Sequence, residues 1–573
     1  MNRALLALLA FALILPSRIP ASDVLRDYIN HRFNAETVQV RDIQGLKDRI
    51  VGGKLHLHLR EFLELVLKNS TDVQLSRLDV YTAAYQITAA KAPFDPTLQL
   101  QFNALRSVTP LLFATGTGNP GSGGNTGGQT GQGGTGTGIG FTQITLPQTI
   151  NSLSQNSNIT YNQVLPTGQT LSTSFAVNRT SGDGYPFPAL FGTFNFTITQ
   201  PLLQNRRNLQ NRSPLIIART DLLITSEASE AAIGTAIAAA ARQYWEAILA
   251  RDNIRVLQQT LDLAQRSYEH DKLALDLGAL ARLDIYQSET QVAERNRDLV
   301  QAQYQYKGAL DGLRRLIGAD LTPSLRSTEI VLEDDAAAIP PRSAILPSEE
   351  AIAKAMQLRP EARAAEQRIS IDALNAQVAR DALLPRLDLS LQGGSSGPGF
   401  NQLGVGSVVG VPANAPYPGL ADTLHQVLAF TYPTYGFGVQ FTFPFRNSTA
   451  QASLATSLVS KARDQYQRRQ IEQQIILDVR QALDSIELAS ASIGAAVETR
   501  DLARKNVQAE QQKYELGTIT AFELLDSQTR LATSESALLN AYVTYQQAYI
   551  DYQKATWTLL NGLGMVVETP KIR

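Results

Sequence analysis

Two stretches of the chain carry a long helical pattern of apolar and polar positions. The run from Phe445 to Thr569 contains no proline, and its second half places large apolar residues seven positions apart, at Leu524, Leu531, Leu538, Tyr545, Tyr552 and Leu559. Small residues follow the first five of these after three positions, at Ser527, Ser534, Ala541, Ala548 and Ala555. Such a large/small heptad repeat is typical of the seam between packed helices. A short break at Tyr514-Glu515-Leu516-Gly517-Thr518 therefore predicts an antiparallel helical hairpin.

The same pattern occurs earlier in the chain. No proline lies between Pro214 and Pro323, Gly278 stands within this run, and the seven-residue step continues at Ile285, Val292, Leu299, Tyr306 and Leu313. At 1.5 Å per residue, the first arms of the two hairpins would be about 95 Å and about 105 Å long, which exceeds any ordinary globular core. The chain therefore contains one elongated hairpin twice.

A shorter repeated unit precedes each hairpin. Helical periodicity over Leu59 to Ala92 ends at a proline and passes into strict alternation from Thr97. The helix expected over Ser348 to Ala382 passes in the same way into a strand after Pro385, 289 positions beyond Pro96. Because helix, strand and hairpin recur in the same order, we interpret the chain as an internal duplication.

Further strands are predicted in both copies by alternation of aromatic or aliphatic residues with small polar ones. In the first copy they lie at 159–161, at 171–177 after a Pro166–Gln169 turn, and at 194–199, and in the second copy at 437–443. This alternation fits a sheet with lipid on one face and water on the other, although a water-soluble sheet with one wet face is an alternative. The Gly-rich tract 114–141 between the first strands predicts a solvated loop.

Composition narrows the possible functions. The net charge is -1, so the chain lacks the excess of basic residues that binds nucleic acid. It also contains no cysteine. The start of the chain, with Arg3, an apolar run from Ala4 to Leu15 and a break at Pro16, is typical of a secretory signal. No later segment has the apolar length of a transmembrane helix, so entry into a membrane would require β-strands.

The sequence offers no enzyme site, metal site or cofactor site. No nucleophile stands in a pattern with a base, and His56 and His58 have no neighbouring third ligand. We expect no catalytic activity.

These patterns divide the chain into six parts. We expect a signal peptide (1–22), an N-terminal periplasmic extension (23–54), a first repeat (55–318), a linker or equatorial segment (319–347), a second repeat (348–564) and a C-terminal tail (565–573).

The doubled layout resembles the TolC-like outer-membrane factor (outer membrane efflux protein) family over about Leu59 to Gly564. The resemblance is carried by the order of elements, by the strand exits Pro201-Leu202-Leu203 and Pro444-Phe445, and by the turns Leu277-Gly278-Ala279-Leu280 and Leu516-Gly517-Thr518-Ile519. It implies an α+β membrane protein of the cell outer membrane, with a large periplasmic portion. In a homotrimer, four strands per chain would close a twelve-stranded β-barrel, and the duplicated hairpins would form a periplasmic α-barrel.

The resemblance also implies partners and site residues. The partners would be outer-membrane lipid, a periplasmic membrane-fusion adaptor and an inner-membrane transporter. The adaptor-docking tips would be Leu277, Gly278, Ala279, Leu280, Leu516, Gly517, Thr518 and Ile519. Glu523 and Asp526 would form acidic rings at the periplasmic entrance, and Asp284 and Tyr514 would help to close it. In the family, two arginines would bond this pair. Their positions are occupied here by Ile519 and Tyr542, so closure of the entrance needs other contacts.

The function implied is a passive exit duct of a tripartite efflux or type I secretion system, with energy supplied by the inner-membrane transporter. A secreted coiled-coil scaffold or adhesin without a channel is the alternative. Such a scaffold would account for the heptads but not for the repeated alternating strands.

Overall fold

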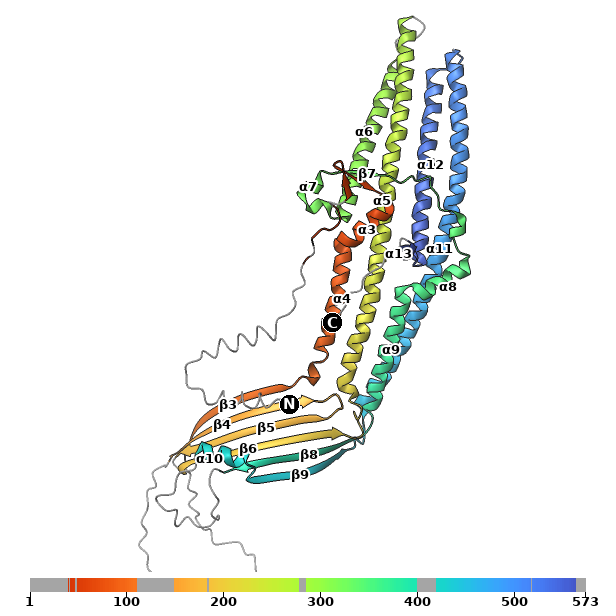
Figure 1. Cartoon of the computed structure of the whole chain (residues 1–573). Coiled ribbons are helices and arrows are strands. Elements are labelled where there is room, and N and C mark those ends of the chain that lie inside the picture. The colour runs from red at the N-terminus through yellow and green to blue at the C-terminus, as the bar shows by residue number, and fades with distance from the viewer. Residues whose placement is uncertain are drawn as a thin grey trace, which may run out of the picture.

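The protein consists of a curved sheet at one end and two long helical hairpins that run away from it (Figure 1). The computed structural model describes residues 40–562 apart from 41, 47–48, 111–148, 183–184, 278–284, 399–418 and 517. The principal elements of the first half are β1 (Ile50–Val51), β2 (Lys54–Leu57), α3 (Leu59–Asn69), α4 (Thr71–Ala89), β3 (Thr97–Pro110), β4 (Thr149–Val164), β5 (Thr170–Gly182), β6 (Tyr185–Pro201), α5 (Leu209–Asp276) and α6 (Ile285–Leu316). Those of the second half are α7 (Pro323–Arg326), β7 (Glu329–Leu332), α8 (Ser348–Leu358), α9 (Pro360–Asp381), β8 (Arg386–Gly397), α10 (Leu420–Leu428), β9 (Tyr432–Thr442), α11 (Ser448–Glu515), α12 (Ala521–Ala555) and α13 (Leu559–Gly562).

The two hairpins are α5 with α6 and α11 with α12. The first arm of each hairpin has 68 residues, which corresponds to about 100 Å of helix. The predicted large/small seam of α12 is confirmed, since its buried residues include Leu524, Ser527, Ser534, Leu538, Tyr545, Ala548, Tyr552 and Ala555. Burial of this seam against the neighbouring helices, rather than helix propensity, stabilises arms of this length.

The shorter helices that precede the strands are each broken once, whereas the sequence predicts single helices. Ser70 separates α3 from α4, and Arg359 separates α8 from α9, both with extended backbone (ψ 129° and 126°). In the second copy Pro360 is the first residue of α9, and its ring disfavours a helical conformation for Arg359. The two breaks are themselves 289 positions apart, so they belong to the repeat.

The large sheet has six strands in the order β3-β4-β5-β6-β8-β9, and each neighbouring pair is antiparallel. The predicted hairpin around Pro166–Gln169 is confirmed as the connection between β4 and β5. The expectation of four strands per chain is wrong. The error arose because β4 and β5 have no counterpart in the second copy, so the repeat predicts only β3, β6, β8 and β9.

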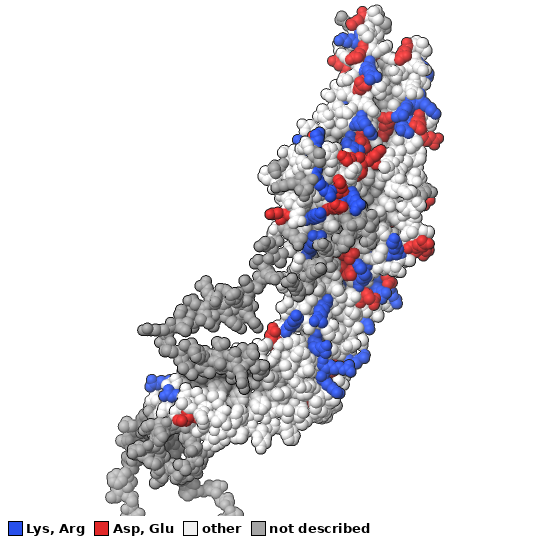
Figure 2. All heavy atoms as spheres, in the orientation of Figure 1, with Lys and Arg blue, Asp and Glu red and all other residues white. Residues whose placement is uncertain are grey.

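The two faces of the sheet differ in polarity. Residues opposite each other in the register share a face, and one such row across four strands is Leu100, Ile159, Phe175 and Phe194. The adjacent row on the opposite face crosses all six strands as Gln99, Thr160, Ser174, Asn195, Gly394 and Thr434. On the molecular face drawn in Figure 2, charged side chains gather over the helices and the sheet is nearly free of them. This arrangement suits lipid on one face and water on the other.

A three-stranded sheet, here called the belt, lies beside α5 and α6 near the middle of the molecule (Figure 1). Its order is β1-β2-β7, with β2 and β7 parallel, so the start of the described chain is joined to the segment between the repeats. Leu57 of β2 is fully buried in one core cluster with Phe62, Tyr244 and Leu313 of the helices. Within the described residues, no helix has the length and hydropathy required to cross a bilayer.

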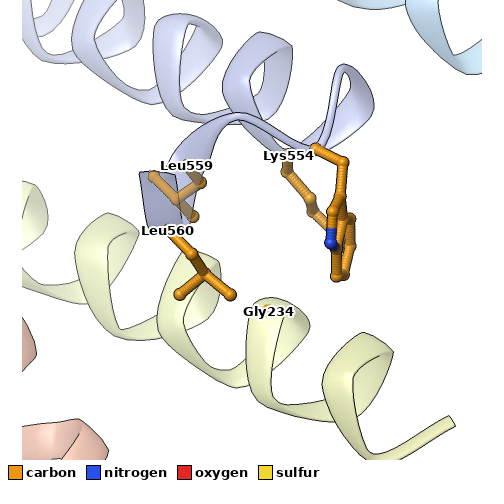
Figure 3. A pocket seen from close by; sticks show the side chains of 5 residues that line it. Gly234, Lys554, Leu559 and Leu560 are labelled. Atoms are coloured by element: carbon orange, nitrogen blue, oxygen red, sulfur yellow. The ribbon is translucent and has the colours of Figure 1, made fainter. Parts of the chain in front are cut away.

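The end of α12 is fixed to α5 by a tryptophan. Trp557 donates from Nε1 to Glu230 Oε1 at 3.0 Å. A Cβ added at Gly234 would lie only 2.5 Å from the indole ring of Trp557, so any larger residue at Gly234 would displace the ring. Leu559 and Leu560 lie beside Gly234 in the same small pocket (Figure 3). This contact joins the end of the second repeat to the first.

Candidate functional site: the hairpin tips and the clasp beside them

Both helical hairpins end at the side of the molecule farthest from the sheet (Figure 1). Gly278, Ala279, Leu280 and Asp284 of the first tip and Gly517 of the second lie outside the described residues. The described tip residues are Leu277, Leu516, Thr518 and Ile519. Both leucines are almost entirely exposed, at 84% for Leu277 and 78% for Leu516.

Large apolar side chains near the tips extend this exposed surface. The set consists of Leu273 and Tyr286 beside the first tip and Phe522 beside the second, each more than half exposed. Exposed apolar residues close together on an otherwise polar helix are typical of a protein interaction surface. Sequence reasoning missed these three, although Tyr286 and Phe522 depart from the seven-residue seams of α6 and α12 and so could have been read as surface residues.

The second tip is closed by backbone hydrogen bonds. Thr518 donates from its backbone nitrogen to the Lys513 carbonyl at 3.0 Å, and its hydroxyl donates to the same oxygen at 2.9 Å. The first of these bonds has the spacing of a Schellman cap, which satisfies carbonyls at a helix end. Ile519 is half-buried, so the turn presents Leu516 and Thr518 outward while Ile519 faces the helices.

Glu523 and Asp526 are both exposed near the start of α12, and each has a local partner. Glu523 accepts a hydrogen bond from the Thr520 backbone nitrogen at 3.3 Å, as a residue of a capping box does. Asp526 forms an ion pair with Arg530 at 2.8 Å. Positions 523, 526 and 530 share one exposed helix face, while Leu524 and Leu525 are buried.

Beside the tips, three helices meet at a buried carboxylate. Asp271 of α5 is 1% exposed, and it accepts hydrogen bonds from the hydroxyls of Ser288 in α6 and Tyr514 in α11. We call Asp271, Ser288 and Tyr514 the clasp, because they connect the first hairpin to the second. The buried charge gains two donors in place of water, which a buried carboxylate requires.

The clasp changes the chemistry of Tyr514. Burial, followed by the hydrogen bond to Asp271 and the charge of Asp271, raises the pKa of Tyr514 above its usual value. The phenol therefore remains a donor over the physiological range of pH. The imidazole of His270 lies beside the Tyr514 ring, with centroids 5.2 Å apart and the ring planes tilted by 55°.

The sequence predicted Tyr514 as a gate residue but not its partner. An aspartate on a long polar helix reads as a solvated residue, and only the spacing of Asp271 along α5, six positions before Leu277, relates it to the tip. Further polar contacts join the hairpins along their length, among them those from Arg295 to Thr529 Oγ1 at 2.6 Å, from Ser536 to Asn253 Oδ1 at 3.1 Å and from Arg242 Nε to Asp551 Oδ1 at 2.9 Å.

The two histidines of the belt have carboxylate neighbours that the sequence does not reveal. His56 Nδ1 lies 2.7 Å from Glu333 Oε1, while His58 lies 2.9 Å from Asp334 through Nδ1 and 2.8 Å from Glu333 through Nε2. Both carboxylates come from the segment that follows β7. Among the described residues no group of three or more potential ligands is arranged to hold a metal ion.

Comparison with known proteins gives a consistent result. The outer membrane efflux protein family matches residues 170–319 and 351–556. The pyoverdine export outer membrane protein OpmQ of Pseudomonas aeruginosa is 24% identical over 322 residues, which cover 56% of this chain and 61% of OpmQ. The chain thus matches about three-fifths of the length of that relative. OpmQ of Pseudomonas putida is 27% identical over 169 residues, covering 30% of this chain and 34% of that protein.

Solved structures show the same fold. A membrane protein from Pseudomonas aeruginosa has a TM-score of 0.58 at 16% identity, covering 91% of this chain and 98% of its own. The CmeC outer membrane channel of Campylobacter jejuni also has a TM-score of 0.58, at 14% identity, covering 92% of this chain and 94% of its own. The family match spans more than half of the chain, and the duplicated hairpins with their sheet have the same fold as these two structures. The chain therefore belongs to the outer membrane efflux protein family.

Proposed function

We propose that the chain is the outer-membrane exit duct of a tripartite efflux or type I secretion system and that it works as a homotrimer. The observation that carries this proposal is the open, two-faced sheet. Within the described sheet, β3 pairs only with β4, and β9 pairs only with β8, so both outer edges carry unpaired backbone groups. Such edges are costly in lipid, and closure by further copies removes them.

The edge strands are suited to pairing with each other. Because the six strands alternate in direction, β3 and β9 run antiparallel, so β9 of one copy can pair with β3 of the next in a ring. Their apolar side chains are exposed in the single chain, with Phe102 at 65% and Phe437 at 76%. A coiled-coil scaffold without a channel accounts for neither the sheet edges nor the polarity of the two faces.

In this proposal the repeats 55–318 and 348–564 are quasi-equivalent sectors of the wall. The helices of three copies would surround a periplasmic tunnel that continues the lumen of the strands. The polar face of the sheet would line the exit, and its apolar face would contact lipid.

The tips would be the docking surface for a periplasmic adaptor, which connects the duct to an inner-membrane transporter. Exposed Leu277 and Leu516 support this role, together with the apolar residues beside them. Gly278, Ala279, Leu280, Gly517, Thr518 and Ile519 complete the proposed tips.

The entrance would lie just behind the tips. Glu523 and Asp526 share the exposed face of α12, and three copies would place two acidic rings around the opening. Tyr514 would help to hold the entrance closed through the clasp, with Asp284 as the second closing residue. The clasp supplies a contact in place of the arginines that are absent at Ile519 and Tyr542.

Fractionation of expressing Gram-negative cells tests the proposal. The full chain should be recovered in outer-membrane fractions as a heat-modifiable trimer, with native mass spectrometry giving three times the mass of the chain. Recovery as a soluble monomer would refute the proposed duct.

A further inference from the structure

We infer that the β4–β5 hairpin is part of the transmembrane wall, so that three copies close a barrel of eighteen strands with a wide, polar exit. This inference rests on the proposed trimer. The inserted β4–β5 hairpin would then help to determine how large a cargo can leave the duct.

The inserted strands have the length of membrane strands. β4 has 16 residues and β5 has 13, compared with 14 in β3 and 17 in β6. A tilted strand needs roughly 9–11 residues to cross a bilayer. β4 pairs with β3 from Thr97↔Asn162 to Pro110↔Thr149 without a register shift, so the insertion continues the wall along its whole height.

The inserted strands also continue both faces of the sheet. Ile159 and Phe175 extend the apolar row between Leu100 and Phe194. Thr160 and Ser174 continue the polar row on the opposite side. A surface appendage surrounded by water would have no reason to keep one face apolar.

Charge gives the same indication. Residues 149–182 contain a single charged side chain, Arg179. It lies near the end of β5 that is remote from the helices, and its guanidinium donates to Gln155 Oε1 at 2.9 Å. Lipid tolerates a basic residue near the edge of the bilayer far better than at its centre.

The turn of the hairpin is fixed to the helical body. Asn208, fully buried at the start of α5, donates from Nδ2 to the carbonyls of Leu165 at 3.1 Å and Pro166 at 3.3 Å. Asn208 has a left-handed backbone (φ 53°) at this contact. Gly168 approaches it closely, since a Cβ added at Gly168 would lie 3.2 Å from the Asn208 side chain. The hairpin is therefore held in the wall at the point where sheet and helices meet.

Six strands per chain in three copies give eighteen strands, where the four strands expected from the repeat give twelve. The diameter of a barrel grows roughly linearly with strand number, so the wall would be about 1.5-fold wider and its cross-section about 2.2-fold larger. Barrels of 16–18 strands leave an aqueous channel. With glutamine, asparagine, serine and threonine on its inner face, this exit would favour bulky polar cargo over small apolar molecules.

Electron cryomicroscopy of the full-length trimer in lipid nanodiscs tests the inference. Eighteen strands in the wall are expected. A trimer with twelve strands and the hairpin outside the wall would overturn the inference while leaving the proposed duct intact. A protein that forms no trimer would overturn both. Deletion of residues 149–184 should reduce the barrel diameter to about two-thirds.

Thiol labelling of the full chain tests the same point without a deletion that could misfold, since the chain has no cysteine of its own. In outer-membrane vesicles, a membrane-impermeant maleimide should modify Ser174→Cys on the polar face roughly tenfold or more faster than Phe175→Cys on the lipid face. Asn195→Cys and Phe194→Cys in β6 form the matched control pair. Equal labelling of the two β5 variants, with the β6 pair still distinct, would place the hairpin in water and overturn the inference.

Discussion

Tyr514 of α11 donates a hydrogen bond to Asp271 of α5, and the accepting carboxylate is almost completely removed from solvent. The two residues belong to different repeats, and Ser288 of α6 donates to the same carboxylate. The relative position of the two hairpins at the tip end thus depends on a buried charge whose donors come from two helices. Any movement that separates the hairpins there must break the Tyr514 hydrogen bond, so that water has to replace this donor at Asp271.

Removal of the Tyr514 hydroxyl should therefore loosen the tip end. In Tyr514→Phe the Asp271 carboxylate loses one of its two hydroxyl donors, which should destabilise the helical body by about 1–3 kcal/mol. The midpoint of denaturant unfolding in detergent should fall, and single channels should be open for a larger fraction of time. Tyr304→Phe is the matched control, because Tyr304 in α6 is 70% exposed. Equal behaviour of the two variants would exclude the clasp as a closing contact.

The acidic residues of α12 should act through their charge. The variant Glu523→Gln with Asp526→Asn removes both charges, while the glutamine oxygen can still accept the hydrogen bond from Thr520. Block of single-channel current by divalent cations should weaken about tenfold or more, with unfolding changed by less than about 1 kcal/mol. If cation block is unchanged in this double variant, Glu523 and Asp526 do not line the entrance.

The exposed leucines of the tips should be needed for export but not for assembly. Leu277→Gln combined with Leu516→Gln removes apolar surface without unfolding a core, because both side chains are exposed. Export in cells and capture of the adaptor should fall several-fold, while trimer yield in outer membranes stays the same. The methionine variants at the same positions keep the apolar surface and should behave as the parent does. Full export by the glutamine variant would mean that docking does not use these residues.

The belt should respond to pH through His58. The hydrogen bond to Asp334 is the main cause that raises the pKa of His58, and only the imidazolium can donate to Asp334 and Glu333 at once. This stabilisation is complete below the unfolded pKa of about 6.5 and is lost as the pH rises through the raised folded value.

Thermal unfolding measured between pH 6 and pH 8.5 checks this effect. The midpoint should fall with rising pH by no more than about 2 °C through His58, since its side chain is half exposed and water screens the pair. His58→Gln should lose this dependence, whereas His425→Gln, at an exposed position of α10, should keep it. A pH profile that is unchanged in His58→Gln would contradict the assignment.

The fold could be predicted from the sequence wherever a pattern is repeated. The heptads of Leu524 to Tyr552 give the hairpins, and the order of elements at an offset of 289 gives the duplication. The alternation of apolar and polar residues predicted strands at β4 and β5. It did not predict six strands in the sheet, because the second repeat has no counterpart of these two strands. Pairing between strands is a long-range property, so alternation alone did not show that β4 and β5 lie between β3 and β6 in one sheet.

The site was predictable only in part. Tyr514 was predicted from the family resemblance, whereas Asp271 stands among many polar residues of α5 and is distinguished only by the fold. The carboxylates beside His56 and His58 were equally unpredictable from the sequence, because the parallel pairing of β2 with β7 brings Glu333 and Asp334 to these histidines. In each case the partner is more than two hundred positions away, which exceeds the reach of any local pattern.

Single-channel recording from purified trimers in planar lipid bilayers tests the central claim most directly. A passive duct should give stepwise ionic current in salt solution alone, without nucleotide or any other protein, and the Tyr514→Phe variant should increase the open fraction. Intact trimers that insert into the bilayer but carry no current above that of bare lipid, in the parent and in the variant alike, would contradict the account.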